Sequence, residues 1–296
     1  MQARHTLSGK VSSSQPLAGK IAAGLILMLI AAFFVFARLP VESIARQQQA
    51  LHRVAVPSID LRAPLPDFPE IHSVQERKEV FFQFLLPLIQ HANQEILAAR
   101  ERIQSLRKQL PHTTLSTEDA LWLVLVAEHY RVPADNGFDA DFFNTLLRRV
   151  DIIPPSLVLA QAATESGWGT SRFAREGNNL FGEYCYVSGC GIVPSRRNPG
   201  ARHEVARFQS PYDALLGYMT NLNRHESYLS FRKHREQARQ TEHPIRGEKL
   251  AEGLIRYSER GQAYIRQIQS MIRHNDLARF DEHRVAETWI SQTAGN

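Results

Sequence analysis

The segment Ala160–Ser171 constrains this chain most strongly, because it must change from helix to turn within a few residues. An apolar helical pattern begins at Pro155 and continues to Glu165. Gly167 and Gly169 then favour a turn, since glycine readily ends helices in a left-handed conformation. Glu165 is therefore expected near a helix C-terminus, where unpaired carbonyl groups discourage ionisation and raise its pKa. A carboxyl group in that setting can act as a general acid, although most glutamates are simply solvated.

Two further motifs follow in order. Gly177–Gly182 reads Gly-Asn-Asn-Leu-Phe-Gly, and Tyr257–Tyr264 reads Tyr-Ser-Glu-Arg-Gly-Gln-Ala-Tyr. Together with Gln161–Ser171, they resemble the signature of the N-acetylglucosaminidases of glycoside hydrolase family seventy-three, over about residues 150 to 275. The sequence departs from that signature at Arg260–Gly261, where the family has Asp-Pro, and the family's second acidic residue has no obvious counterpart.

The resemblance implies an endo-β-N-acetylglucosaminidase that cleaves the N-acetylglucosaminyl-β-1,4-N-acetylmuramyl bond of peptidoglycan glycan strands, with Glu165 as the general acid and no cofactor. Glycoside hydrolysis usually needs a second carboxylate. In the family that acid lies in a hairpin, which favours Glu204 and leaves Glu183 as the runner-up. A hairpin glutamate paired with a neighbouring arginine is the competing interpretation of Glu204. If neither serves, the acetamido group of the substrate attacks with help from a tyrosine.

Other residues of the three motifs are candidate contacts of the sugar. The resemblance favours Tyr257 as a catalytic residue and Tyr264 as a substrate-binding residue, whereas core packing is the alternative for both. Further substrate-binding candidates, each with a packing or loop-holding alternative, are Trp168, Asn178, Asn179 and Phe181. The 12 histidines form no ligand pattern, so no metal site is predicted.

Two other functions stay open. A lytic transglycosylase shares a catalytic glutamate followed by serine, but it normally continues into a different glycine and glutamine pattern. A catalytically silent wall-binding or scaffold protein is the alternative from another class, because the second acid is uncertain. The net charge of +5 suits an anionic membrane or an acidic polymer, and no compact Lys/Arg run indicates nucleic acid.

Residues Ile21–Ala37 carry no charge and are almost wholly apolar, which predicts a membrane-directing segment. Its length favours an uncleaved anchor, although the small residues in Val35–Ala37 also suit a cleavage site. If the substrate is cell wall, the protein is a single-pass inner-membrane protein with its catalytic domain in the periplasm. Cleavage of the segment would instead release it into the periplasm.

The only two cysteines, Cys185 and Cys190, are separated by a short loop that contains glycine. Such spacing lets them meet as a disulfide, which an exported protein permits. A metal pair is the alternative, but zinc normally needs four ligands and no second Cys or His cluster completes such a site.

The predicted fold is mostly α, an α+β domain of the lysozyme-like kind that the resemblance implies, preceded by a single N-terminal membrane helix. Helices are expected from Gln75, with Pro87 kinking or splitting the first one. The extended runs 192–193 and 205–208 predict one small hairpin. The predicted parts are a tail (1–20), a transmembrane anchor or signal segment (21–38), a proline-rich linker (39–73), a helical part (74–149), a glucosaminidase-like catalytic domain (150–285) and a tail (286–296).

Overall fold

The computed structural model describes residues 59–135, 137–195, 197, 200–241 and 244–282. The predicted membrane segment 21–38 and the tails 1–20 and 286–296 lie outside these residues. Within the described part of the chain, no helix combines the length and the apolar character needed to cross a membrane.

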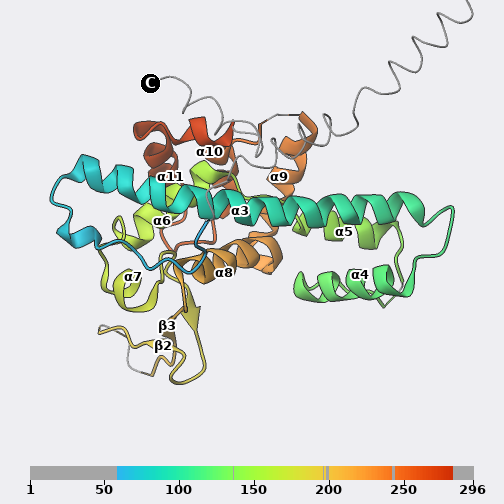
Figure 1. Cartoon of the computed structure of the whole chain (residues 1–296), viewed down its shortest axis with the longest axis horizontal. Coiled ribbons are helices and arrows are strands. Elements are labelled where there is room, and N and C mark those ends of the chain that lie inside the picture. The colour runs from blue at the N-terminus through green and yellow to red at the C-terminus, as the bar shows by residue number, and fades with distance from the viewer. Residues whose placement is uncertain (1–58, 136, 196, 198–199, 242–243, 283–296) are drawn as a thin grey trace, which may run out of the picture. The chain divides into compact units, whose positions relative to one another are not determined.

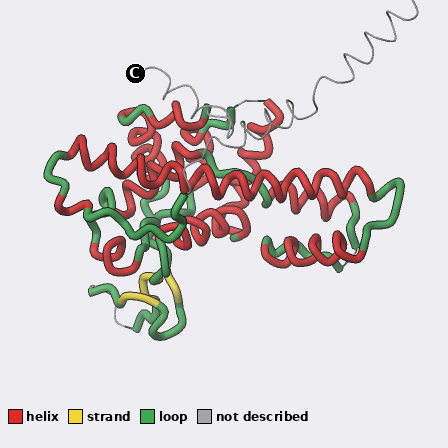
Figure 2. The backbone as a smooth tube through the Cα atoms, in the orientation of Figure 1, coloured by secondary structure: helices red, strands yellow, loops and turns green. Residues whose placement is uncertain are grey.

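Helices dominate the described residues, as predicted, and a small sheet accompanies them (Figures 1 and 2). The α-helices are α3 (Val74–Gln109), α4 (Thr117–His129), α5 (Ala140–Arg149), α6 (Pro155–Ser166), α7 (Arg172–Gly177), α8 (Pro211–Arg224), α9 (Leu229–Thr241), α10 (Gly247–Leu250) and α11 (Gln262–His274). Short 3-10 helices are η1 (Phe68–Glu70), η2 (Glu226–Tyr228), η3 (Ala251–Leu254) and η4 (Leu277–Asp281).

The long helix α3 packs against different partners along its length. It begins after Ser73, whose hydroxyl oxygen accepts a hydrogen bond from the backbone N–H of Glu76 at 3.2 Å. Phe81, in its first half, is buried in the main core, whereas Ile103 is buried in a second apolar cluster with α4 and α5. Figure 1 shows α4 and α5 beside the far end of α3. The helix continues through Pro87, so the predicted split does not occur, because packing on both sides of the proline stabilises one helix.

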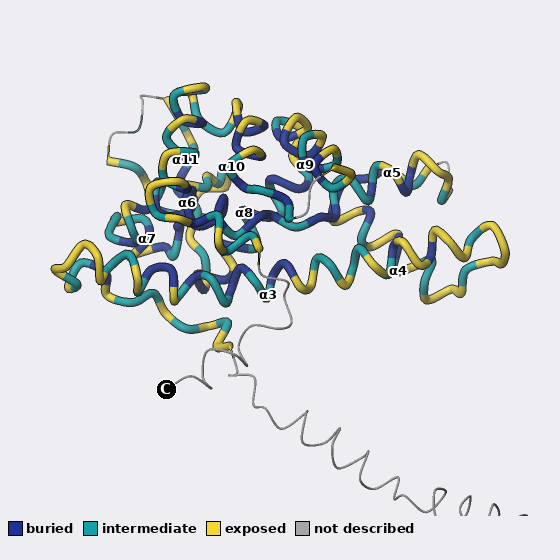
Figure 3. Tube along the Cα trace, turned by 90° about the horizontal axis from the view of Figure 1, so that it is seen from above, coloured by how far each residue is buried: buried dark blue, intermediate teal, exposed yellow. Residues whose placement is uncertain are grey.

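Helix α6 carries Glu165 and is surrounded by other elements. It contacts α3, α10, α11 and η4. Every residue from Ser156 to Ala163 is therefore buried, whereas α4 is largely exposed (Figure 3). The carboxylate of Asp281 accepts hydrogen bonds from the backbone N–H and the hydroxyl of Ser156, at 2.9 and 2.6 Å. These bonds join the start of α6 to the end of the described chain.

Part of the range predicted as a linker packs on the helical core. Phe68 in η1 is fully buried, and its ring centroid lies 5.4 Å from that of Phe81. The turn after α6 approaches the same ring, since a Cβ atom at Gly169 would lie 2.1 Å from Phe68 Cδ2. Gly169 also has a φ of +78°, a conformation that favours glycine. Phe68 thus holds the turn that follows Glu165.

The sheet has three short strands, β1 (Tyr184–Cys185), β2 (Gly191–Ile192) and β3 (Glu204–Ala206), in the order β1-β3-β2. The pairing of β2 with β3 is antiparallel and confirms the predicted hairpin. The pairing of β1 with β3 places Cys185 opposite Glu204 and was not predicted. A strand of two residues is too short to produce an alternating pattern that sequence could reveal.

A buried carboxylate joins three helices. Asp151, only 2% exposed, lies between α5 and α6 and faces Arg239 of α9, with which it pairs through both oxygens. Arg100 of α3 lies 3.5 Å and Arg235 of α9 lies 4.0 Å from its Oδ2. Asn223 of α8 donates to the backbone oxygen of Asp151 at 3.0 Å. Burial alone would raise the pKa of Asp151, but the surrounding arginines, Arg235 foremost, bring it below its ordinary value.

Candidate active site

Glu165 lies in the last turn of α6, as predicted, and its side chain is half-buried. Burial raises the pKa of its carboxyl group, while a hydrogen bond from Tyr264 and the charge of Arg260 act in the opposite direction. The sequence predicted this direction from the helix terminus, but the cause of the raised pKa is burial. A Cβ atom at Gly182 would lie 3.5 Å from Glu165 Oε2, so the backbone of that loop passes beside the carboxyl group. The fold therefore brings all three sequence motifs together at Glu165.

Three buried side chains connect to Glu165 through hydrogen bonds. The hydroxyl of Tyr218 in α8 donates to Oε1 of Gln161 at 2.6 Å. Nε2 of Gln161 donates to the hydroxyl oxygen of Tyr264 at 3.0 Å, and Tyr264 is hydrogen-bonded to Glu165. Burial is also the main reason that the pKa of Tyr264 lies far above its ordinary value. Tyr264, predicted to bind substrate, therefore contacts the candidate acid directly.

Stacked aromatic rings surround these hydrogen bonds. Phe181 lies parallel to Tyr218 with ring centroids 4.1 Å apart, and Tyr257 lies parallel to Tyr264 at 5.3 Å. The hydroxyl of Tyr257 donates to the backbone oxygen of Phe181 at 2.9 Å. Only 2% of Phe181 is exposed, so its ring packs in the core and is not accessible to a ligand. The Tyr257 hydroxyl likewise has a partner within the protein.

Glu183 is the second carboxyl group of this region. It follows the Asn-Leu-Phe-Gly loop, is half-buried, and burial raises its pKa to about 7, against a hydrogen bond from Asn221. Its Oε2 would lie 2.8 Å from a Cβ atom at Gly217, so the carboxyl group packs closely against α8 where glycine leaves room for it. After burial, the charges of Glu183 and then Glu165 raise the pKa of Tyr228 to about 12. Tyr228 therefore lies within electrostatic reach of both carboxyl groups.

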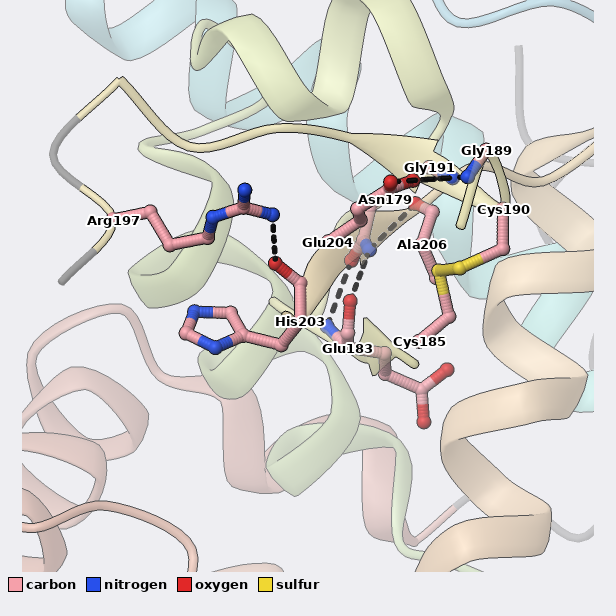
Figure 4. Close-up of a disulfide and its surroundings, with 10 residues drawn as sticks. All are labelled: Asn179, Glu183, Cys185, Gly189, Cys190, Gly191, Arg197, His203, Glu204 and Ala206. Carbon is pink, nitrogen blue, oxygen red and sulfur yellow. Dashed lines mark hydrogen bonds between the residues drawn. A yellow bond between two sulfur atoms is a disulfide. The ribbon is translucent and has the colours of Figure 1, made fainter. Parts of the chain in front are cut away.

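Glu204 has a different environment. Its carboxylate accepts backbone hydrogen bonds from Gly189 at 3.0 Å and from Gly191 at 2.8 Å, and these bonds lower its pKa. Figure 4 shows this carboxylate against the loop, whereas the carboxyl group of Glu183 points away from it. The competing interpretation, a hairpin glutamate paired with arginine, holds in part, because the charge of Arg197 also lowers the pKa of Glu204 but contributes less than the backbone hydrogen bonds. The Glu204 carboxylate is thus bound to its own loop, whereas the carboxyl group of Glu183 points away from that loop.

The two cysteines lie beside Glu204. Their Sγ atoms are 1.97 Å apart, at bonding distance, in the arrangement that Figure 4 draws as a disulfide. In the described residues, Cys185, Cys190 and Glu204 are also the one group whose ligand atoms cluster, within 4.8 Å, as a metal site requires. Bonded cysteines cannot supply thiolates, however, and the group has no fourth ligand, so a metal fits poorly.

The remaining substrate-binding candidates have partners within the protein. Asn178 ends α7 with a φ of +54° and donates to the backbone oxygen of Phe208 at 3.0 Å. Asn179 is 2% exposed and its amide bonds to the backbone on both sides of the loop, at Glu183 and Ala206. Both asparagines therefore hold the loop that passes Glu165.

Trp168, half-buried, packs edge-on against Phe81 and Phe82 of α3, with ring centroids 5.6 Å away in each case. The ammonium group of Lys78 lies 5.1 Å from its ring centroid. These contacts favour packing over sugar binding.

Sequence reasoning gave no role to Gln161 and did not identify Tyr218, Asn221 or Tyr228. Gln161 belongs to the first motif, so its fixed place there was a signal. The other three lie on α8 and η2, far along the chain from Glu165, and their positions follow only from how α8 packs on α3 and α9.

Comparison with known proteins identifies the family of this chain. Residues 140–277 match the glucosaminidase family, described as mannosyl-glycoprotein endo-beta-N-acetylglucosaminidase. The chain is 36% identical over 211 residues to Protein bax of Escherichia coli (strain K12). The matched region covers 71% of this chain and 74% of that protein. No solved structure matches the chain. The chain therefore belongs to glycoside hydrolase family seventy-three, as a Bax-like member.

Proposed function

We propose that the protein is a peptidoglycan hydrolase, an endo-β-N-acetylglucosaminidase that cleaves the N-acetylglucosaminyl-β-1,4-N-acetylmuramyl bond. The observation that carries the proposal is the half-buried carboxyl group of Glu165, which has a raised pKa where the three family motifs meet. A raised pKa keeps the proton available for the glycosidic oxygen. The matched family description names the same class of bond to N-acetylglucosamine.

Glu183 is the proposed second carboxylate. The reaction needs one proton on Glu165 and an ionised Glu183, which accepts a proton from the attacking water while the bond to the leaving oxygen breaks. Its placement supports this role, because its carboxyl group is not committed to backbone N–H groups as that of Glu204 is. The acetamido-assisted scheme needs a free tyrosine hydroxyl, and those of Tyr257 and Tyr264 already have partners.

The cellular setting belongs to the same proposal. The apolar run Ile21–Ala37 anchors the chain in the inner membrane, and the catalytic domain lies in the periplasm, where peptidoglycan is accessible. A mostly helical domain with a small sheet is also compatible with the lysozyme-like fold that the resemblance implies.

The test is Glu165→Gln in the full-length chain, purified in detergent and incubated with peptidoglycan sacculi. The amide keeps the shape of the side chain but has no transferable proton, so activity should fall by about 10²- to 10⁴-fold or more, with the melting temperature nearly unchanged. Mass analysis of the wild-type products should find reducing N-acetylglucosamine ends, because water completes the reaction.

Three outcomes would contradict the proposal. A retained rate in Glu165→Gln removes this residue from the mechanism. A majority of anhydromuramyl products identifies a lytic transglycosylase instead. Binding to sacculi without any product identifies a silent wall-binding protein.

A further inference from the structure

The hydrogen bonds behind Glu165 have a fixed direction. A carbonyl oxygen can only accept, so Tyr218 must be the donor in its 2.6 Å contact with Oε1 of Gln161. The amide nitrogen of Gln161 then faces Tyr264 and donates to its hydroxyl oxygen at 3.0 Å. The hydroxyl proton of Tyr264 is therefore left for Glu165.

This direction matters because all three supporting side chains are enclosed. Gln161 is 0%, Tyr218 1% and Tyr264 2% exposed, so water cannot replace a lost bond without entering the core. The ring of Tyr218 is also held by the parallel ring of Phe181, and that of Tyr264 by Tyr257. The side chains thus have little freedom to choose other partners.

We propose that Gln161 is a positioning residue: together with Tyr218 it fixes the hydroxyl of Tyr264 as a hydrogen-bond donor to Glu165, and so orients the carboxyl group that delivers the proton. The inference rests on the proposed function for its catalytic meaning. The hydrogen bonds themselves are a property of the folded protein and do not depend on that function.

The alternative state of the amide shows what Gln161 prevents. If the amide turned by 180°, its oxygen would face Tyr264, which would then donate to Gln161 in place of Glu165. The ionised carboxylate of Glu165 opposes this turn, because it can only accept and takes the hydroxyl proton of Tyr264, whose oxygen then needs a donor such as the Gln161 amide. The Tyr218 hydroxyl completes this pattern by donating to Oε1 of Gln161. Tyr218 acts on Glu165 through two intermediates and touches no reacting atom.

Loss of the Tyr264 hydrogen bond should raise the pKa of Glu165, since that bond favours the ionised form. The other groups that interact with Glu165 are Arg260, whose charge lowers its pKa, and the neutral hydroxyls of Tyr218, Tyr228 and Tyr257. Glu183 is the further carboxyl group that acts on Tyr218 and Tyr228. Removing one tyrosine hydroxyl does not change the charge of Arg260 or of the other tyrosines near neutral pH. Only the protonation of the two carboxyl groups can respond to it.

The experiment follows the titration of Glu165 directly in the full-length protein with ¹³C-carboxyl-labelled glutamate. The Glu165 signal is assigned by its absence in Glu165→Gln. Tyr264→Phe should raise the pKa of Glu165 by about one to two pH units, as expected for loss of a hydrogen bond to a charged group. Gln161→Met and Tyr218→Phe should shift it in the same direction by a smaller amount.

Tyr212→Phe is the matched control. Tyr212 also lies on α8, is buried, and donates its hydroxyl to Glu95 at 3.0 Å, outside the hydrogen bonds described above. It should leave the titration of Glu165 unchanged. An equal shift in this control, or no shift in a folded Tyr218→Phe protein, overturns the inference, and Tyr218→Phe remains the decisive variant if Gln161→Met does not fold.

Activity measurements separate this inference from the proposed function. For the enzyme, the basic limb of the pH profile of kcat/KM should move to higher pH in Tyr218→Phe, by the same amount as the titration of Glu165. The value of kcat should fall by a larger factor than KM rises. If the titration shifts but sacculi yield no product, the positioning role holds and the proposed function fails. If products form and the titration does not move, the positioning role is wrong and the proposed function stands.

Discussion

Glu165, Glu183 and Glu204 are one residue type in three environments. Two backbone N–H groups stabilise the ionised form of Glu204 and lower its pKa, whereas burial raises the pKa of Glu183 to about 7. Burial also raises the pKa of Glu165, against a hydrogen bond from Tyr264. Burial therefore favours the protonated form of Glu165 and Glu183, whereas its backbone hydrogen bonds favour the ionised form of Glu204. Such differences between neighbouring carboxyl groups distinguish proton-transfer groups from structural ones.

The proposed role of Glu183 predicts that activity and stability change in opposite directions in Glu183→Gln. Activity should fall by about 10²- to 10⁴-fold, because the amide cannot accept a proton from water. The folded pKa of about 7 lies above the ordinary value of 4.5, so the folded state binds more protons than the unfolded state between these values. The free energy of unfolding of the wild type should thus decline as pH rises through this window. Urea unfolding at several pH values should find that Glu183→Gln lacks this decline and exceeds the wild type at about pH 8.

Glu204→Gln is the matched comparison. The pKa of Glu204 is shifted in the opposite direction, below its ordinary value. The stability that its ionised form contributes is therefore present above the ordinary carboxyl pKa and is lost on acidification. This variant should lose stability at neutral pH and keep most activity. A fully inactive but equally stable Glu204→Gln, beside an active Glu183→Gln, would assign the second acid to Glu204.

The position of Glu165 in the last turn of a helix was predictable, because Gly167 and Gly169 mark where that helix ends. The hydrogen-bond acceptors of Glu204 were not, since they are backbone groups that approach only when the loop folds back. Sequence also gave no reason to connect Tyr218 with Gln161. That contact depends on the packing of α8, which local patterns do not encode.

At the scale of elements, helical segments were predicted more successfully than strands. Helices α5, α8 and α11 follow apolar periodicity over at least ten residues, a length at which the pattern repeats and can be recognised. Strand β1 has two residues and no such pattern. The continuous helix through Pro87 is supported by burial of Leu85 and Leu88, on either side of the proline, in the same main core, which a local rule for proline cannot anticipate.

Asp151 should be essential to the way these helices are joined. Asp151→Asn leaves Arg100, Arg235 and Arg239 without their shared carboxylate, and removing one partner of a buried ion pair typically costs about 3–5 kcal/mol. Denaturant unfolding at neutral pH should detect a loss of this size. The control is Asp119→Asn, which breaks a more exposed pair with Arg102 and should cost far less, because solvent screens that pair. Equal losses in the two variants would contradict a special role for Asp151.

At the scale of the whole molecule, the proposed periplasmic location rests on one feature of the sequence and one of the structure. The apolar run Ile21–Ala37 predicts export or anchoring, and the Sγ atoms of Cys185 and Cys190 lie at bonding distance in a loop that also holds Glu204. Disulfides form and persist in oxidising compartments and are rare in the cytosol. Because Glu204 caps the same loop, the state of the cysteines bears on the shape of the small sheet beside Glu183.

The proposed location therefore predicts the thiol state of the protein in cells. In the full-length chain, trapped with acid and alkylated without reductant, neither Cys185 nor Cys190 should be labelled, because the domain lies in the periplasm. A chain that lacks residues 1–38 stays in the reducing cytoplasm and should be labelled at both positions. Cys185→Ser in the full-length chain is the control, since it leaves one thiol that must react. Labelling of both cysteines in the full-length wild type would contradict the disulfide and remove this support for a periplasmic domain, and about one zinc per chain would identify a metal site in its place.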